Sequence, residues 1–371
     1  MAQSIFFYTD SRELGGAEDA LFTLMEALDP HAWEPTLLLD AAPGTEELAD
    51  RSRALGVPHL LIPEMPLGRK GAQRVPAMAR MLRRERPAVF HAHLTSPMGA
   101  KYPLAAAVAA RVRAVVATVH LIPPFAIDRS NRLQLRLLAR LVGAYIAVSQ
   151  DIAAGLADDL RWPRGKIDVI YNAVDSSRFG QPAPPALRAG LAGGGDGPVV
   201  LTCARLHEQK GHTYLLHAAA ELPRVMFAFA GEGPARAGLE AEAARIGVAE
   251  RVRFLGHRDD IPELLAASDL VAIPSLYEGS PIAVLEAMAA ERAIVGSAVG
   301  GMGELIEDGE TGILVPPRDV AALAAGLRRL LEDPARRRAM GDRGRRRVES
   351  DFGPTAMAGQ VEGVYERLLA S

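Results

Sequence analysis

Short apolar runs alternate with helical patterns along the whole chain. Runs rich in β-branched or aromatic residues occupy 5–8, 36–39, 60–62, 89–92, 115–119, 146–148 and 169–170, and a second series occupies 199–203, 226–230, 252–255, 270–274, 293–296 and 312–315. Between these runs, apolar residues recur at the three- and four-residue spacing of amphipathic helices. This alternation predicts a parallel sheet covered by helices, and here it occurs twice.

The two series are separated by a stretch with little apolar periodicity. Residues 176–197 are rich in Pro, Gly and Ala, which is typical of a linker between domains. We therefore predict one α/β domain at 1–175, a linker at 176–197, a second α/β domain at 198–352 and a final helix within 353–371. Ligands of open α/β sheets bind at the carboxyl ends of the strands, so we expect the site in a cleft where these ends face each other.

Composition narrows the class of protein. The chain has 371 residues, 49% hydrophobic and 23% charged, which suits a globular protein with two cores. Its net charge of -3 provides no global attraction to nucleic acid or membrane. The single cysteine, Cys203, excludes an intramolecular disulfide and suits a reducing cytoplasm. We expect no signal peptide at the start and no membrane span, because Arg111 and Arg113 interrupt the most apolar window.

Two glutamates stand where a predicted strand gives way to a helix. The strand at 269–275 leads to Glu278 on a loop, and Glu286 follows on the helix. We expect Ser280 to cap this helix and Pro281 to be its first residue. Carboxylates accept hydrogen bonds from paired sugar hydroxyls, and the helix start offers N–H groups to an anion. The residues predicted to line this turn are Gly279, Ser280, Pro281 and Ile282.

Two further loops follow the first strand of each predicted domain. After the strand at 199–203 come Arg205 and Lys210, which can clamp a pyrophosphate as a fork and a point charge. After the strand at 5–8, Gly15 and Gly16 precede a helix and let the backbone pass close to a phosphate. A plain tight turn is the alternative for this glycine loop.

Three histidines lie near predicted strand ends in the first domain. We expect His91 and His93 to point to opposite faces of their strand, and no acidic or Cys partner follows them, so the pattern does not favour a metal site. His93, at the strand end, is expected to line the cleft on the acceptor side. His120 is placed to hydrogen-bond a sugar hydroxyl, and a satisfied structural histidine is the alternative.

The remaining loops carry weaker signals. Gly231 lies in a Gly-x-Gly-Pro stretch that fails as a dinucleotide fingerprint, because Arg236 occupies the third glycine position. His257 and Arg258 follow the strand at 252–255, and Asn172 follows the strand at 169–170. We read Asn172 as a cleft-wall or hinge residue rather than a catalyst.

Together these motifs resemble the retaining glycosyltransferases of family 4, which have the two-domain GT-B fold. The resemblance is carried by the stretch from Tyr277 to Met288, by the loop from Arg205 to Gly211 and by the Gly15-Gly16 loop. It implies that Glu278 holds sugar hydroxyls, that Glu286 holds the ribose and that Gly16 faces the donor's diphosphate. It also implies that His120 lies by the sugar's C6 hydroxyl.

For the weaker loops, the resemblance implies that Gly231 lines the nucleotide side and that the loop of His257 and Arg258 pairs with the base. It further implies that the final helix crosses back to brace the first domain. The chain departs from the family pattern at Leu121, where many relatives have an acid, and at Ala173, where glycine is usual.

The resemblance predicts an enzyme that moves a sugar from a nucleotide-diphosphate sugar, most often a UDP-sugar, to an acceptor hydroxyl, without a required cofactor or metal. The acceptor class is a sugar, a glycolipid or a small molecule, in bacterial glycan, glycolipid or glycoside synthesis. A nucleotide-sugar epimerase of the same shape and a non-catalytic sugar-nucleotide binding protein are the alternatives. The first would need cleft acids and bases that we do not find.

One helical segment suggests a further partner. Arg129, Arg132, Arg136 and Arg140 recur beside a leucine stripe, a pattern suited to an anionic membrane surface or an anionic acceptor. A solvated face on a packed helix is the alternative. For the arginine run at 328–347 we expect a solvated helical face rather than nucleic-acid binding, because no aromatic residues accompany it.

Overall fold

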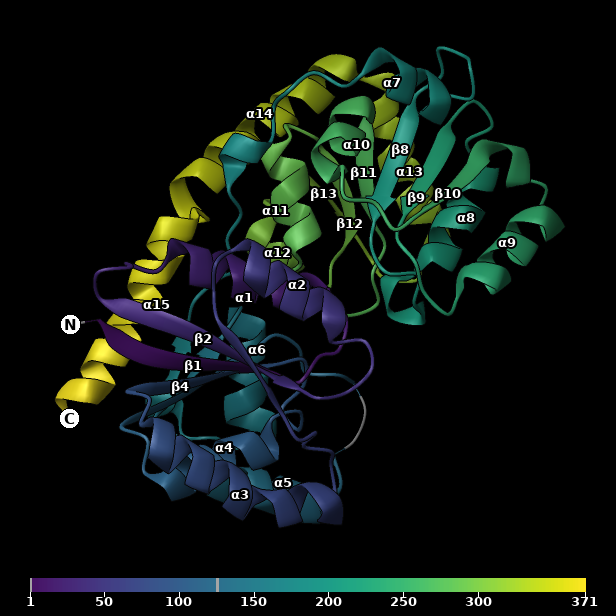
Figure 1. Cartoon of the computed structure of the whole chain (residues 1–371). Coiled ribbons are helices and arrows are strands. Elements are labelled where there is room, and N and C mark those ends of the chain that lie inside the picture. Colours follow the sequence, from purple (N-terminus) through teal and green to yellow (C-terminus); the bar gives the residue numbers. More distant parts are fainter. Residues whose placement is uncertain (1, 125–126) are drawn as a thin grey trace. The chain divides into compact units, whose positions relative to one another are not determined.

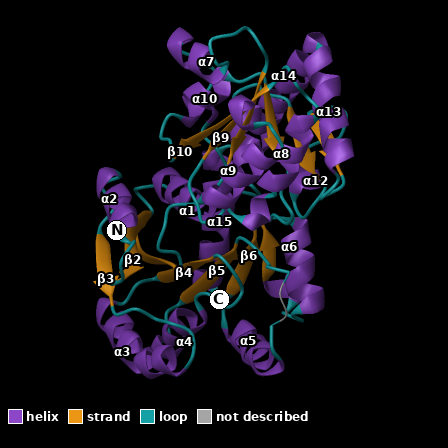
Figure 2. Cartoon of the chain, turned by 90° about the vertical axis from the view of Figure 1, so that its right-hand side faces the viewer, coloured by secondary structure: helices purple, strands orange, loops and turns teal. Residues whose placement is uncertain are grey.

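The chain forms two parallel sheets, each in its own compact unit. A computed structural model describes residues 2–124 and 127–371. The first unit comprises Met1–Ala173 with Pro354–Ser371, and the second comprises Val174–Gly353. Figures 1 and 2 show both sheets with helices packed against them. The prediction of two Rossmann-like α/β domains is therefore confirmed.

The first unit contains a seven-stranded sheet in the order β3-β2-β1-β4-β5-β6-β7. Its strands are β1 (Gln3–Thr9), β2 (Trp33–Asp40), β3 (His59–Ile62), β4 (Val89–Leu94), β5 (Ala114–Val119), β6 (Ala144–Ala147) and β7 (Ile167–Val169). All neighbouring strands pair in parallel. Each of the seven predicted apolar runs of this half overlaps or adjoins one of these strands.

Helices cover both faces of this sheet. On one face, α3 (Arg69–Glu85), α4 (Lys101–Ala110), α5 (Arg129–Leu141) and α6 (Gln150–Ala154) share a core with residues such as Phe90 and Val115. On the other face, α1 (Gly16–Ala27), α2 (Glu46–Ala54) and α15 (Pro354–Ala370) share a core with Phe7 and Val116. Because a strand alternates its side chains, β1, β2, β4, β5 and β6 contribute to both cores.

The second unit contains a six-stranded parallel sheet in the order β10-β9-β8-β11-β12-β13. Its strands are β8 (Val199–Cys203), β9 (Met226–Ala230), β10 (Val252–Gly256), β11 (Leu270–Ile273), β12 (Ile294–Ser297) and β13 (Gly312–Val315). Helices α8 (His212–Ala220), α9 (Arg236–Arg245) and α13 (Val320–Glu332) share one core. The other helices are α10 (Ile261–Ala267), α11 (Ile282–Ala289), α12 (Met302–Leu305) and α14 (Pro334–Asp351), and α11 packs on α14.

The stretch expected to be a linker has structure of its own. Residues 176–197 contain a 3-10 turn at Ser176–Arg178 and helix α7 (Pro185–Leu191), and they belong to the second unit. The last helix, α15, belongs to the first unit and packs on α1. Within the described ranges, no helix is long and apolar enough to cross a bilayer.

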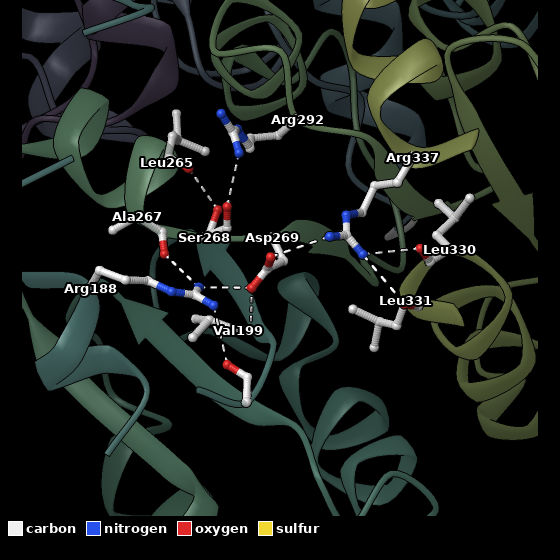
Figure 3. Close-up of polar contacts among 11 residues, drawn as sticks. Arg188, Val199, Leu265, Ala267, Ser268, Asp269, Arg292, Leu330, Leu331 and Arg337 are labelled. Atoms are coloured by element: carbon white, nitrogen blue, oxygen red, sulfur yellow. Dashed lines mark hydrogen bonds and ion pairs between the residues drawn. The ribbon is translucent and has the colours of Figure 1, made fainter. Parts of the chain in front are cut away.

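Asp269 joins distant segments at the amino end of the second sheet (Figure 3). Its carboxylate accepts hydrogen bonds from the backbone N–H of Val199 at 2.9 Å and from Arg337 at 3.3 Å, and it forms an ion pair with Arg188 at 2.7 Å. Arg188 lies on α7, and Arg337 lies on α14. This one carboxylate therefore fastens α7 and α14 to the sheet, at the edge opposite the strands' carboxyl ends.

Candidate active site

A partly buried ion pair lies at the carboxyl edge of the second sheet. Lys210 Nζ lies 2.6 Å from Glu278 Oε1, and the same carboxylate oxygen accepts a hydrogen bond from Ser275 Oγ at 2.7 Å. The Glu278 residue is 7% exposed. A carboxylate loses hydration on burial, so it needs these partners to remain charged. The arrangement holds one carboxylate and one ammonium at fixed positions beside the strand ends.

Backbone contacts fasten the two loops that carry this pair. Gln209 Nε2 donates to the carbonyl of Tyr277 at 3.0 Å, and Leu276 N donates to the carbonyl of Gln209 at 2.7 Å. A third loop closes on them at Gly300, where φ is +48° and a Cβ would lie 1.9 Å from the carbonyl oxygen of Glu278. Glycine at position 300 thus lets the chain pass directly behind Glu278.

The second predicted carboxylate, Glu286, lies on α11, one turn into the helix. Burial, and then the charges of Glu286 and Asp260, raise the pKa of the Cys203 thiol, which places Glu286 near the end of β8. The predicted cap is wrong by one residue, because Pro281 is the N-cap and the helix begins at Ile282. Gly279, Ser280 and Pro281 are buried in the turn that precedes it.

The basic residues of the β8–α8 loop differ in their environment. Arg205 is exposed, and its backbone carbonyl accepts a hydrogen bond from His212 Nε2 at 3.2 Å. Lys210 ends a 3-10 turn, Glu208–Lys210, in which His207 Nδ1 accepts a hydrogen bond from the backbone N–H of Gln209 at 3.3 Å. The loop therefore presents a guanidinium and holds an ammonium on one short segment.

The neighbouring loops place the weaker candidates. Gly231 has φ +143°, and a Cβ there would lie 2.2 Å from the carbonyl oxygen of Ala204, so this glycine allows the β9 loop to pack on the β8 loop. His257 is exposed and lies 3.2 Å from Asp259, whereas Arg258 pairs with Asp260 through two nitrogens. Gly231, His257 and Arg258 thus each have a contact within the protein. That they contact a nucleotide stays a prediction.

A cavity of about 300 Å³ opens beside this site in the second unit. Its lining includes His207, Glu208 and His212 from the β8–α8 segment together with Leu239 and Val320. Arg205, Lys210, Glu278 and Glu286 do not line it. The cavity therefore adjoins the charged residues through the β8–α8 segment rather than enclosing them.

In the first unit, the glycine loop is lined by carboxyl groups. Gly15 is the N-cap of α1, and Gly16 is its first residue, with open space where a Cβ would be. Glu18 accepts a hydrogen bond from Thr9 Oγ1 at 3.0 Å, and burial raises the pKa of its carboxyl to about 7. Asp10 accepts from the backbone N–H of Thr95 at 2.9 Å, and burial raises its pKa to about 6. The expected phosphate contact at Gly16 stays a prediction.

The three histidines form a buried network. The rings of His91 and His93 lie 4.6 Å apart, so the expectation of opposite faces was wrong, since residues two apart in a strand share a face. His93 Nδ1 and His120 Nε2 are 3.0 Å apart. His91 is hydrogen-bonded through Nδ1 to the Tyr365 hydroxyl at 2.6 Å and through Nε2 to Thr118 Oγ1 at 2.8 Å. Burial lowers the pKa of His91 to about 3 and that of His120 to about 4. Among the described residues, no group of three or more His, Cys, Asp or Glu side chains is arranged to hold a metal ion.

His93, His120 and Asn172 also line a cavity of about 20 Å³, enough for one water molecule. In the loop predicted after His120, Phe125 and Ala126 lie outside the described residues. Gly15, Gly16 and these three residues belong to the first unit, and the other candidates belong to the second. Their convergence in one cleft stays a prediction.

Sequence reasoning missed several residues that shape the site. Ser275 and Gln209 hold Glu278 and its loop, and the buried acids Asp10 and Glu18 flank the glycine loop. Ser275 stands three residues before Glu278 at the end of the strand pattern, which is a usable signal. Nothing in the local sequence marks the Gln209 side chain as a site residue, because its partner, Tyr277, lies 68 residues away.

Two family models match the chain, and together they span most of it. The model described as Glycosyltransferase Family 4 matches residues 14–178. The model described as Glycosyl transferases group 1 matches residues 186–347. The two matches fall almost entirely on the first and second unit, respectively.

Curated relatives match part of the chain. The alpha-D-kanosaminyltransferase of Streptomyces kanamyceticus is 37% identical over 179 residues, which are 47% of this chain and 46% of that protein. The 2-deoxystreptamine glucosyltransferase of the same organism is 32% identical over 63% of each chain. The matched stretches thus span about half to two thirds of these relatives, short of their full length.

Solved structures share the whole fold. The Anabaena protein HepE in complex with UDP-glucose has a TM-score of 0.85 at 25% identity, covering 98% of this chain and 99% of that one. Sucrose-phosphate synthase from Thermosynechococcus elongatus has a TM-score of 0.81 at 22% identity, covering 99% of each chain. With its two Rossmann-like units and both family models matched, the chain belongs to glycosyltransferase family 4 and has the GT-B fold.

Proposed function

We propose that the protein is a retaining glycosyltransferase that moves a sugar from a UDP-sugar to an acceptor hydroxyl. The observation that carries the proposal is the partly buried ion pair of Lys210 and Glu278 at the carboxyl edge of the second sheet. Family membership supplies the reaction class, and the pair supplies the two kinds of group that a nucleotide sugar needs. An ammonium matches its diphosphate, and a carboxylate matches its hydroxyls.

The donor would separate this pair on binding. In the structure Lys210 and Glu278 form an ion pair, so each charge has an opposite charge beside it. In the proposed complex Lys210 and Arg205 turn to the diphosphate, and Glu278 accepts hydrogen bonds from sugar hydroxyls, those on C3 and C4. Glu286 accepts from the ribose.

The chemical step breaks the bond between the anomeric carbon and the diphosphate oxygen, and negative charge grows on the departing UDP. Arg205 and Lys210 would stabilise that charge, together with the N–H groups near Ser280 and Gly16. This mechanism assigns the charge to protein cations, so no metal ion is required. The acceptor hydroxyl would attack from the face that UDP leaves and give its proton to the departing diphosphate, with His120 beside the sugar's C6 hydroxyl.

Support for uridine comes from the HepE complex with UDP-glucose, which shares the fold at 25% identity. Support for a sugar-like or glycoside acceptor comes from the relative named as a 2-deoxystreptamine glucosyltransferase, whose name gives 2-deoxystreptamine as the acceptor of a glucosyl group. On these grounds the acceptor belongs to bacterial glycan, glycolipid or glycoside synthesis, and we place the protein in the cytoplasm, where its lone Cys203 stays reduced. His93 and Asn172 are the proposed acceptor-side residues.

Incubation with a panel of nucleotide sugars tests the proposal. Mass spectrometry should show slow release of UDP from one UDP-sugar, faster in the presence of sugar acceptors, and release should continue in EDTA. A sugar that changes its configuration while it stays attached to UDP would indicate an epimerase instead. Tight binding of UDP without release from any donor would indicate a non-catalytic binding protein. Either result overturns the proposal.

A further inference from the structure

Helix α5 turns a row of leucines to solvent. Leu133, Leu137 and Leu141 are 58%, 52% and 63% exposed, and they recur every four residues along one side of the helix. The opposite side of the helix carries Leu135 and Leu138, which are buried against the sheet. Single exposed leucines are ordinary, but three in one row form an apolar surface that the rest of the first unit leaves uncovered.

A row of arginines runs beside the leucines. Arg132, Arg136 and Arg140 each precede one of the exposed leucines, and Arg129 extends the row by one turn. Arg132 and Arg136 donate to the backbone carbonyls of Asp159 and Leu160 at 3.3 and 3.0 Å, which holds their side chains in place. Helix α5 contains no acidic residue, and its arginines form no ion pair within the described ranges.

The other arginine-rich helix of the chain differs in this respect. On α14, Arg337, Arg343, Arg345 and Arg347 form ion pairs with Asp269, Glu310, Glu349 and Glu307. The charge of α14 is thus largely matched within the protein. The arginines of α5 have no such counter-charges among the described residues, so they are available to an anionic partner outside the protein.

The faces of the first sheet differ in charge as a whole. Helices α3, α4 and α5, which lie together at the bottom of Figure 1, carry eleven Lys or Arg residues and one acidic residue. The adjoining α6 and its π-helical continuation add three acidic residues, one of them paired with Arg164. Helices α1, α2 and α15 on the other face carry three Lys or Arg residues and eight acidic ones. A net charge of -3 conceals this separation.

We propose that the α5 surface, defined as Leu133, Leu137 and Leu141 with Arg129, Arg132, Arg136 and Arg140, docks on an anionic lipid bilayer. The leucines would enter the boundary between headgroups and acyl chains, and the arginines would meet lipid phosphates. A second copy of this chain fits less well, because a twofold pairing of α5 would set one arginine row near the other. The inference goes beyond sugar transfer and does not rest on it.

Flotation with lipid vesicles tests the inference on the full chain. The protein should float with vesicles of equal parts phosphatidylglycerol and phosphatidylcholine, and remain behind with phosphatidylcholine alone. Binding should weaken at high salt, because the arginine contacts are screened. The triple variant L133Q/L137Q/L141Q and the double variant R129Q/R140Q should each bind the anionic vesicles roughly tenfold more weakly.

Matched variants elsewhere separate the α5 surface from general stickiness. L60Q/L61Q removes two exposed leucines of β3, and R338Q/R346Q removes two exposed arginines of α14, and both should bind like the wild type. Circular dichroism checks that each variant is folded. Equal binding by all variants, or no binding to anionic vesicles, would overturn the inference. The inference would also be overturned if the wild type formed a dimer and the L133Q/L137Q/L141Q variant were monomeric, because the leucines would then contact a second copy of the chain.

Discussion

At the scale of single residues, Lys210 and Glu278 illustrate a pair whose partners have different work in the proposed reaction. An ammonium that stabilises a departing diphosphate acts mainly in the transition state, when the charge grows. A carboxylate that holds hydroxyls acts already in the bound donor. The pair should therefore respond asymmetrically to substitution.

Replacing Lys210 by Met should lower turnover by roughly a hundredfold or more, with a much smaller loss of donor affinity. Steady-state UDP release gives the first quantity, and calorimetric titration with a donor analogue gives the second. Lys210→Arg, which keeps the charge, should recover part of the rate. If affinity and turnover fall by the same factor, Lys210 binds ground state and transition state alike.

Replacing Glu286 by Ala should weaken donor binding about tenfold while the fold stays intact, because a carboxylate-to-hydroxyl contact of the ribose is lost. A thermal-shift titration with UDP measures the change. Glu263→Ala, at an exposed position of α10, is the matched control and should leave UDP binding as it is. Unchanged UDP affinity in the Glu286 variant would contradict its ribose role.

Glu18 should make the first unit less stable as pH rises. Burial raises the pKa of its carboxyl from 4.5 to about 7, so the folded state holds a proton that the unfolded state has lost. The contribution of Glu18 to the free energy of unfolding is fully present below the pKa of 4.5 that the carboxyl has in the unfolded state, and it is lost as pH rises through about 7. The loss is on the order of 2–3 kcal/mol. Asp10, with its pKa raised to about 6, acts in the same direction at lower pH.

Urea unfolding at several pH values measures this slope. Glu18→Gln keeps an oxygen for the Thr9 hydroxyl without a charge, so it should flatten the slope and stabilise the protein above pH 7. Glu26→Gln, at an exposed position of the same helix, should leave the slope unchanged. An identical slope in wild type and Glu18→Gln would count against a protonated Glu18 in the folded state.

At the scale of elements, the Asp269 network shows how α7 and α14 are tied to the sheet. Asp269→Asn should destabilise the second unit by about 1–3 kcal/mol, because two partly buried guanidinium groups lose their counter-charge. Glu310→Gln removes an ion pair whose carboxylate side chain is 64% exposed, and it should cost less than about 1 kcal/mol. Chemical denaturation ranks the two variants, and the opposite order would refute the assigned importance of Asp269.

The positions of the strands could be predicted from the sequence, because both the apolar pattern and the length of each run indicated a strand. Every predicted strand run corresponds to a strand, because buried parallel strands are short apolar segments bounded by turns. The start of α11 was misplaced by one residue. A serine followed by a proline fits the usual preferences for an N-cap and a first helical residue, yet the helix begins one residue later, at Ile282. The prediction that His91 and His93 point to opposite faces misapplied the period of a strand. Side chains two residues apart point to the same face, so the sequence itself could have placed both rings together.

Contacts between distant segments were beyond the pattern. Lys210 and Glu278 were both predicted as site residues, but their bond joins positions 68 apart and depends on how two loops close. The bond between His91 and Tyr365 spans 274 residues. Periodicity shows which side of an element is buried, and it does not show which element covers it.

At the scale of the whole molecule, the first unit is built from two separate stretches of chain. Met357, Ala358, Val361, Val364 and Tyr365 of α15 are buried in its second core, where Tyr365 also bonds His91. Deleting residues 354–371 should therefore lower the unfolding temperature of the first unit by about 10 °C or more, and leave that of the second nearly unchanged.

Calorimetry with limited proteolysis assigns the two transitions to their units. Tyr365→Phe, which leaves His91 Nδ1 without its partner, should cost about 1–2 kcal/mol and give an intermediate result. Removing only residues 370–371, at the exposed end, should change nothing measurable. If the long deletion melts like the wild type, α15 contributes little to the first unit.

This division also governs the order of events during synthesis. A ribosome delivers the sheet of the first unit early, but the helix that closes one of its cores emerges only after about 180 intervening residues. Until then the nascent chain carries an open apolar groove over α1, the kind of surface that chaperones recognise. A chain interrupted before α15 would leave that apolar surface exposed, because residues of α15 are the ones that cover it.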